Sequence, residues 1–103
     1  RPGLHLLAET GGKNAYVVSA MSDRELAIRD VVQSAFGHAG QKCSACSLLI
    51  LEAEVHDDPH FMATLKDAVE SLKVGSAWDE RSFVTPLIQA PAGPLLRALN
   101  GAR

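Results

Sequence analysis

The chain is poor in the features that mark several large classes of protein. Its 103 residues include two cysteines, whereas a secreted scaffold of this size usually carries more. The formal net charge is −2 and no basic stripe is present to neutralise phosphates, so we expect no nucleic-acid partner. No apolar run approaches the roughly 18 residues that a membrane span needs. We therefore expect a cytoplasmic protein with free thiols.

What is present is the composition of one small globular domain. Hydrophobic residues make up 47% of the chain and charged residues 21%, and a chain of 103 residues can enclose a modest core. The first residue is Arg1, and no signal peptide precedes the first apolar run. We therefore expect a piece of a longer polypeptide.

Apolar runs and helical spacings alternate along the chain. We predict strands over residues 4–8, 15–18 and 47–55. We predict a helix capped by Ser22 and Glu25 and ended by Gly37 and Gly40, a second from Asp58-Pro59 to Gly75, and a short last one from Gly93. This order favours an α/β fold with an open, mostly parallel sheet and flanking helices. The continuous apolar half of the third strand indicates burial on both faces.

A cysteine with small neighbouring residues is the first candidate for a catalytic residue. Cys43 follows Gly40 closely and precedes Ser44 and Ala45. A lone free cysteine is most often an inert, buried side chain. Here, however, the small neighbours allow a substrate to approach, together with backbone N–H groups that can stabilise an oxyanion.

A carboxylate is the second candidate. Glu9 stands at the carboxyl end of the predicted strand 4–8, which is the edge where ligands generally bind in α/β sheets, and Gly11-Gly12 then permits a sharp turn. A thiol and a carboxylate can serve as nucleophile and base if the fold brings them together.

Cys43 and Cys46 also form a C-x-x-C pair, which is found in redox and metal sites. Redox versions place the pair at a helix N-terminus, whereas this pair follows one predicted helix and precedes a strand. A structural zinc site needs four ligands, and the chain has no second cysteine pair. We expect no metal site and interpret Cys46 as a packed small hydrophobe.

Two motifs of the chain together resemble those of the aldehyde dehydrogenase superfamily. Residues 9–14 read E-T-G-G-K-N and resemble its glutamate motif E-x-G-G-K; residues 40–45 read G-Q-K-C-S-A and resemble its cysteine motif G-Q-x-C. The resemblance continues to residues 85–88 and covers nearly the whole chain. Two positions resemble the motifs of the 1-pyrroline-5-carboxylate dehydrogenases in particular. These are Thr10, where most relatives have leucine, and Ser44 directly after the cysteine.

The resemblance implies a reaction and roles for five residues. These enzymes oxidise L-glutamate γ-semialdehyde to L-glutamate with NAD⁺ in proline breakdown. Cys43 would be the nucleophile, and its backbone N–H would form half of an oxyanion hole. Glu9 would activate the water that hydrolyses the thioester. Ser44 would bind the α-carboxylate of the substrate, and Glu9, Thr10 and Gly11 would contact NAD⁺.

The same resemblance implies that much of the enzyme lies outside this chain. The family's cofactor-binding domain lies upstream, with an asparagine that completes the oxyanion hole, and an oligomerisation strand is also absent. We therefore expect residues 1–103 to be a partial catalytic domain that is inactive alone and can self-associate. We expect the parent to be a homo-oligomer; many relatives also carry a proline dehydrogenase half.

Three alternatives stay open on the sequence. The first is an aldehyde dehydrogenase for another aldehyde, against which Thr10 and Ser44 argue. The second is a non-catalytic relative or interaction module, which is disfavoured because both Cys43 and Glu9 are present. The third is the C-x-x-C redox or metal module.

Overall fold

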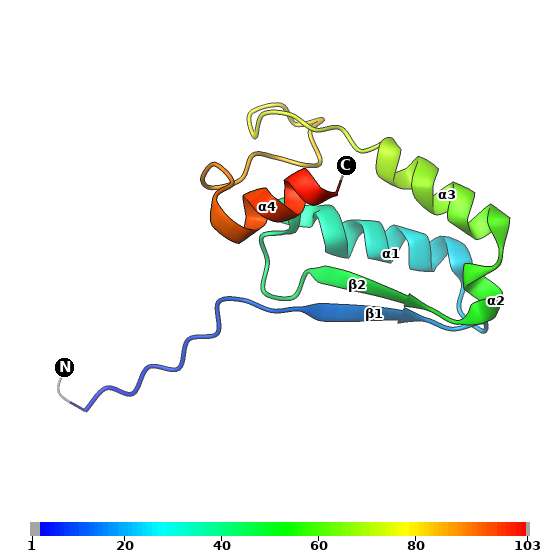
Figure 1. Ribbon diagram of the computed structural model, residues 1–103, viewed down its shortest axis with the longest axis horizontal. Helices are drawn as coiled ribbons and strands as arrows, with labels where there is room; N and C mark the ends of the chain where they lie inside the picture. Colours follow the sequence, from blue (N-terminus) through cyan, green and yellow to red (C-terminus); the bar gives the residue numbers. More distant parts are fainter. Residues whose placement is uncertain (1–2, 103) are drawn as a thin grey trace.

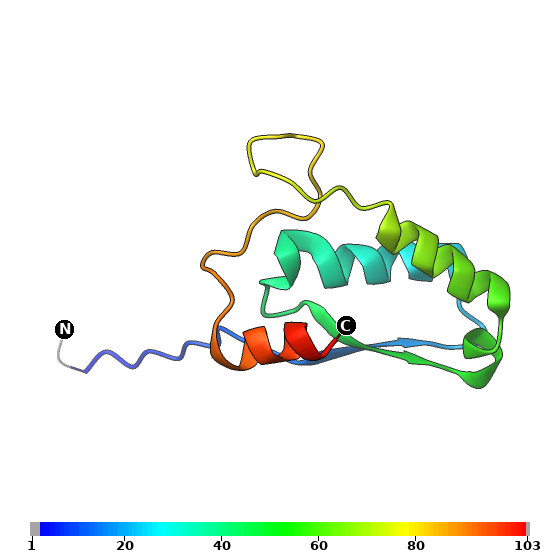
Figure 2. The same ribbon diagram turned by 45° about the horizontal axis from the view of Figure 1, so that its top comes forward.

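The computed structural model describes residues 3–102 and places helices on one side of a parallel strand pair (Figures 1 and 2). The strands are β1 (Asn14–Val18) and β2 (Cys46–Leu51), and the helices beside them are α1 (Arg24–Phe36) and α3 (Pro59–Glu70). The predicted α/β class with a parallel sheet and flanking helices is confirmed, for a sheet of two strands in the described residues.

Three shorter elements complete the described chain. A 3₁₀ segment, Gly37–Gly40, follows α1, and helix α2 (Ala53–His56) follows β2. Helix α4 (Gly93–Gly101) begins at the predicted glycine. None of the helices in residues 3–102 is long and apolar enough to cross a membrane.

The core lies between the strand pair and the helices. Helix α1 is the crossover that joins the two parallel strands, and its predicted apolar face packs inward through Ile28 and Val32, as does Phe36 at its end. Val18 of β1, Val55 of α2 and Phe61 of α3 close the same cluster and are almost completely buried. Burial of a side chain such as Phe61 stabilises the fold by about 1.5–3 kcal/mol.

The first turn of α1 differs from the prediction. The N-cap is Asp23, whose Oδ1 accepts the backbone N–H of Leu26 at 2.9 Å, and not Ser22. Ser22 Oγ instead accepts the backbone N–H of Ser19 at 3.2 Å. The predicted capping box of Ser22 and Glu25 is therefore wrong, because the helix begins one residue later and the Ser22 hydroxyl is bonded to Ser19.

Two strand predictions are also wrong. Residues 4–8 form no strand; they extend away from the helices and β2 (Figure 1), and Leu7 is 96% exposed. A strand needs a neighbour for its hydrogen bonds, and the described chain offers none at that place. The predicted strand 47–55 ends at Leu51, because Glu52 is the N-cap of helix α2. The side chain of Glu52 accepts the N–H of Ala20 at 2.6 Å.

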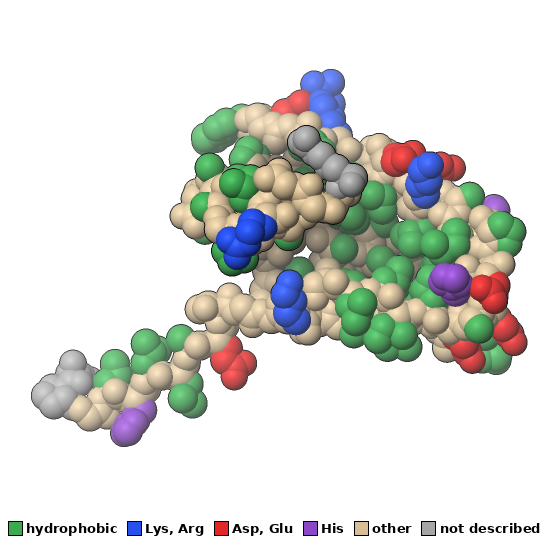
Figure 3. Space-filling model, viewed as in Figure 1, with side chains coloured by type: hydrophobic (Ala, Val, Ile, Leu, Met, Phe, Trp, Pro, Cys, Tyr) green, Lys and Arg blue, Asp and Glu red, His purple; other side chains and the backbone are tan. Residues whose placement is uncertain are grey.

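Strand β2 corresponds to the third predicted strand. Its apolar run predicted burial on both faces, and this prediction is wrong. Leu49 and Leu51 pack on the core, but Leu48 and Ile50 are 58% and 44% exposed. Hydrophobic side chains gather over the strands and along the N-terminal segment (Figure 3). We call the side of the sheet opposite the helices the outer sheet face; it is formed by Ala15, Val17, Leu48 and Ile50.

The start of α3 matches the prediction closely. Asp58 is the N-cap and its Oδ1 accepts the N–H of His60 at 2.9 Å, with Pro59 in the first turn. Its other oxygen accepts from the guanidinium of Arg24 at the start of α1. Asp58 therefore joins the beginnings of two helices.

Acid should weaken the fold partly through Asp58. Burial acts to raise the pKa of Asp58, but hydrogen bonds from the His60 and Phe61 N–H groups and the charge of Arg24 outweigh it and hold the pKa below its ordinary value. Since the native pKa is lowered, the carboxylate stabilises the fold above an ordinary value of about 4, and this contribution disappears as pH falls through the native pKa.

We expect the melting temperature of the chain to fall between about pH 5 and pH 2, and to fall less steeply in Asp58→Asn. Circular dichroism melts across this range measure the effect. Asp67→Asn, an exposed position on α3, is the matched control and should follow the unmutated chain. If the melting temperature of Asp58→Asn fell as steeply with pH as that of the unmutated chain, Asp58 would not contribute to the acid sensitivity of the fold.

Candidate active site

Cys43 lies in a tight turn between α1 and β2. The N–H of Ala45 donates to the carbonyl of Lys42 at 3.0 Å, so Cys43 and Ser44 are the two central residues of a four-residue turn. We call residues 42–45 the cysteine turn. Cys43 is exposed and is a free thiol. The turn thus presents the thiol at the surface.

The backbone before the cysteine turn is unusual. His38, Ala39 and Gly40 have left-handed torsions, with φ of 53°, 55° and 71°. Non-glycine residues rarely adopt this region, and they do so preferentially at functional sites. The run reverses the chain at the end of α1 and directs it back towards β1.

The glycine-rich segment before β1 lies against the cysteine turn. A Cβ atom placed on Gly12 would come within 2.2 Å of the carbonyl oxygen of Cys43. Asn14, the first residue of β1, donates from Nδ2 to the carbonyls of Cys43 at 2.8 Å and Ala45 at 3.1 Å. The fold therefore brings together the two motifs that the sequence analysis singled out.

Glu9 precedes the glycines that lie against the cysteine turn, but it does not contact the thiol of Cys43. It is exposed, and within residues 3–102 it forms no hydrogen bond or ion pair. Gly12 is three positions after Glu9 in the chain, a span of at most about 11 Å. Glu9 also precedes β1 and follows no strand, so its placement at the carboxyl edge of the sheet was wrong. The candidate site lies at the amino ends of both strands, because the crossover returns the chain to the edge where β1 begins.

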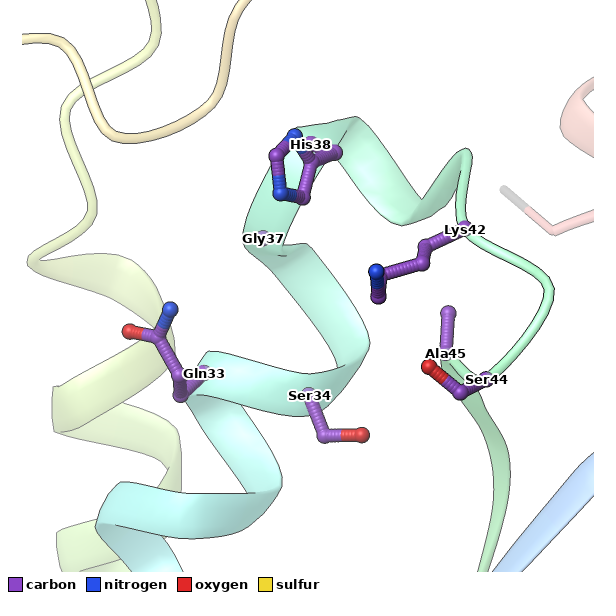
Figure 4. Close-up of a pocket in the computed structure, with 7 residues that line it drawn as sticks. All are labelled: Gln33, Ser34, Gly37, His38, Lys42, Ser44 and Ala45. Atoms are coloured by element: carbon purple, nitrogen blue, oxygen red, sulfur yellow. The ribbon is translucent and has the colours of Figure 1, made fainter.

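Ser44 lines a polar hollow beside the cysteine turn. The hollow has a volume of about 240 Å³ and lies between the end of α1 and the turn (Figure 4). The side chain of Lys42 extends into this space, with Ser34 and Ser44 nearby; the full lining comprises Gln33, Ser34, Gly37, His38, Lys42, Ser44 and Ala45. A lysine ammonium and two hydroxyls are groups that can bind a carboxylate.

Two side chains that the sequence analysis left without a role hold the ends of the cysteine turn. Gln41 donates from Nε2 to the carbonyl of His38 at 3.1 Å, and its Oε1 accepts the N–H of Ile88 at 3.0 Å. Ser34 Oγ accepts the N–H of Cys46 at 3.1 Å. No local signal could have revealed these bonds to Ile88 and Cys46, since both depend on the tertiary fold.

Residues 9–11 leave room for one end of a dinucleotide. They are exposed, and nothing lies within 4 Å of the position that a Cβ on Gly11 would take. The pyrophosphate of such a cofactor is usually held by a glycine-rich turn at a helix N-terminus, and the chain contains no G-x-G-x-x-G. Residues 9–11 therefore leave open space next to the cysteine turn and supply no cradle for a pyrophosphate.

Gly12 should be sensitive to the addition of a single methyl group. Because the Cβ of Gly12→Ala would collide with the Cys43 carbonyl, the strand or the turn must move, and we expect the free energy of unfolding to drop by about 1–3 kcal/mol. Gly11→Ala meets open space and should change it by less than about 0.5 kcal/mol. Urea unfolding of the two variants measures the difference; equal stabilities would show that the close approach is absent.

Comparison with known proteins shows what this chain is similar to. The aldehyde dehydrogenase family matches residues 2–97. A 1-pyrroline-5-carboxylate dehydrogenase of Geobacillus sp. (strain WCH70) is 41% identical over 87 residues, which are 84% of this chain and 16% of the relative. A malonate-semialdehyde dehydrogenase of Lacticaseibacillus casei is 38% identical over 82 residues, which are 80% of this chain and 16% of the relative.

A solved structure agrees with these sequence matches. The crystal structure of HpcC from Thermus thermophilus superposes with a TM-score of 0.70 at 33% identity, and the match covers 77% of this chain and 15% of that chain. The chain thus spans 16% of the length of the curated relatives named above. On the family match and on the shared fold, the chain belongs to the aldehyde dehydrogenase family.

Proposed function

We propose that this chain is the nucleophile-bearing part of an NAD-dependent dehydrogenase that oxidises L-glutamate γ-semialdehyde to L-glutamate. The observation that carries the proposal is the position of Cys43, an exposed thiol on a turn that is bonded to the E-T-G-G-K-N segment through Asn14. The similarity to 1-pyrroline-5-carboxylate dehydrogenases supports the substrate, and the two free thiols suit the reducing cytoplasm.

Cys43 is the nucleophile in this proposal. Its Sγ bonds to the aldehyde carbon, and the carbonyl oxygen takes up the negative charge and then a proton, which gives a thiohemiacetal. In this proposal the backbone N–H of Cys43 donates to that oxygen and stabilises its charge. NAD⁺ bound beside residues 9–11 would accept the hydride that leaves the same carbon. The hydroxyl group of the thiohemiacetal would lose its proton to solvent, and a thioester on Cys43 would result.

Glu9 completes the cycle as a general base. It takes a proton from a water molecule whose oxygen attacks the thioester carbon; the carbon–sulfur bond breaks and releases the carboxylic acid and the thiol. Glu9 is exposed, and in this proposal its carboxylate also accepts the proton of the Cys43 thiol before attack.

Ser44 and Lys42 are the proposed carboxylate-binding residues. They line the hollow next to Cys43, and the names of both groups of relatives refer to a compound that carries a carboxylate, 1-pyrroline-5-carboxylate in one and malonate semialdehyde in the other. A second candidate substrate, malonate semialdehyde, is therefore favoured by the 38% identity to the Lacticaseibacillus casei enzyme. The two substrates differ in the length of chain between aldehyde and carboxylate.

We also propose that residues 1–103 act within a longer polypeptide as part of its catalytic domain. The outer sheet face exposes four apolar side chains, with Val17 66% exposed, and a sheet of two strands leaves both of its edges open. Such faces and edges are normally covered in a complete domain, and their exposure in isolation favours self-association.

The nucleophile can be tested in a full-length polypeptide that carries this chain. We expect Cys43→Ala to lower NADH formation from glutamate γ-semialdehyde by at least about 10³-fold, because no other group replaces the thiol. Cys46→Ala, three residues away at the start of β2, is the control and should keep most of the activity. Equal loss in both variants would favour a paired-thiol site, and turnover of malonate semialdehyde alone would favour the second substrate.

The role of Glu9 can be separated from that of Cys43 by rapid kinetics. In Glu9→Gln we expect one rapid burst of NADH per active site and a steady-state rate lower by about 10²–10⁴-fold, because the thioester forms but water is not activated. Stopped-flow absorbance measures the burst, with the unmutated protein as the control. An unchanged steady-state rate would exclude Glu9 as the base for hydrolysis.

A further inference from the structure

The amide of Asn14 occupies a position that the proposed chemistry leaves unexplained. Its Nδ2 atom has two hydrogens, and each has an acceptor on the cysteine turn: the carbonyl of Cys43 at 2.8 Å and the carbonyl of Ala45 at 3.1 Å. The acceptors are 29 and 31 residues away in sequence. A single side chain therefore joins the start of β1 to both ends of the peptide segment that carries Ser44.

The backbone of Asn14 is also bonded to β2. The register of the two strands pairs Asn14 with Cys46 and Ala15 with Leu48, so Ser47 is an extra residue in β2. The hydroxyl of Ser47 donates to the carbonyl of Asn14 at 3.3 Å. Such irregularities occur beside active sites, where they redirect a neighbouring side chain.

The donor chemistry at this position is specific. Two carbonyl oxygens face one atom, so that atom must carry two hydrogens and no lone pair directed at the turn. An amide nitrogen meets this demand. A carboxylate of the same shape would place an anionic oxygen against two carbonyl dipoles, and a methyl group would leave both carbonyls without a donor.

We propose that Asn14 is a positioning residue that fixes the orientation of Cys43 for attack, an inference that rests on the proposed dehydrogenase function. Its bond to the Cys43 carbonyl fixes the plane of the peptide between Cys43 and Ser44. Its bond to Ala45 fixes the residue whose N–H closes the turn onto Lys42. Because the carbonyls of Cys43 and Ala45 are both bonded to Asn14, strand β1 sets the direction of the Cα–Cβ bond of Cys43 within the cysteine turn.

Asn14→Asp tests this role, because it keeps the shape of the side chain and removes both donors. Asn100→Asp, an exposed position on α4, is the matched control for the added charge. Hydrogen exchange of this chain gives the first readout. We expect the Ala45 and Cys46 N–H groups to exchange about tenfold faster in Asn14→Asp. The Glu52 N–H, bonded to Val18 at the other end of the strand pair, should be unchanged.

Kinetics of the full-length polypeptide give the second readout. We expect kcat and the rate of the NADH burst to fall by about 10–100-fold in Asn14→Asp, with KM for NAD⁺ within about twofold of the unmutated value, since a misdirected thiol slows attack and leaves cofactor binding intact. Asn100→Asp should match the unmutated protein in both.

Each contrary outcome identifies what has failed. Unchanged exchange at Ala45 and Cys46 would show that Asn14 does not hold the turn. Faster exchange with unchanged kcat and burst rate would overturn the positioning role. If the unmutated full-length protein oxidises neither semialdehyde, the proposed function fails, and the exchange data still decide whether Asn14 fixes the turn. If Asn14→Asp loses protection at Glu52 as well, Asn14→Ala, which adds no charge, replaces it in both measurements.

Discussion

The parallel pairing of β1 with β2 is the constraint on which the rest of the structure depends. Parallel neighbours cannot be joined by a tight turn, so the chain crosses over through α1 and returns to the edge of the sheet where β1 began. The two segments that precede the strands, residues 9–13 and 40–45, consequently meet at that edge. Topology brings them together, and the hydrogen bonds from Asn14 to the carbonyls of Cys43 and Ala45 then fix their relative position.

Local signals in the sequence predicted α1, α3 and α4, but α2 lies within the predicted strand 47–55, and α3 ends at Glu70 and not at Gly75. Asp58-Pro59 marks the start of α3 because a capping carboxylate and a proline act within one turn, and the spacing of Ile28 and Val32 identifies the buried face of α1 without reference to other elements. The α/β class followed from the alternation of these helices with apolar runs. The choice of Asp23 over Ser22 as N-cap was less predictable, because either side chain supplies an acceptor and only the exact path of the chain selects one.

The strands and the site depended on distant partners, which the sequence does not display. Residues 4–8 have the composition of a strand but no neighbour in the described chain, and Leu48 and Ile50 are exposed because the helices cover only one face of the sheet. The motifs around Glu9 and Cys43 could be recognised from residue type and spacing. The part played by Asn14 could not, because it arises from contacts about thirty residues away along the chain.

The left-handed run before the cysteine turn limits how this region can vary. Such torsions cost about 1–2 kcal/mol for each non-glycine residue, and His38 and Ala39 adopt them between two fixed ends, α1 and β2. A residue gained or lost between Phe36 and Cys46 would move the turn along β1 and offer the wrong carbonyls to Asn14. Insertions and deletions should therefore be rarer here than exchanges of side chain, so that the length of this connection is inherited more strictly than its composition.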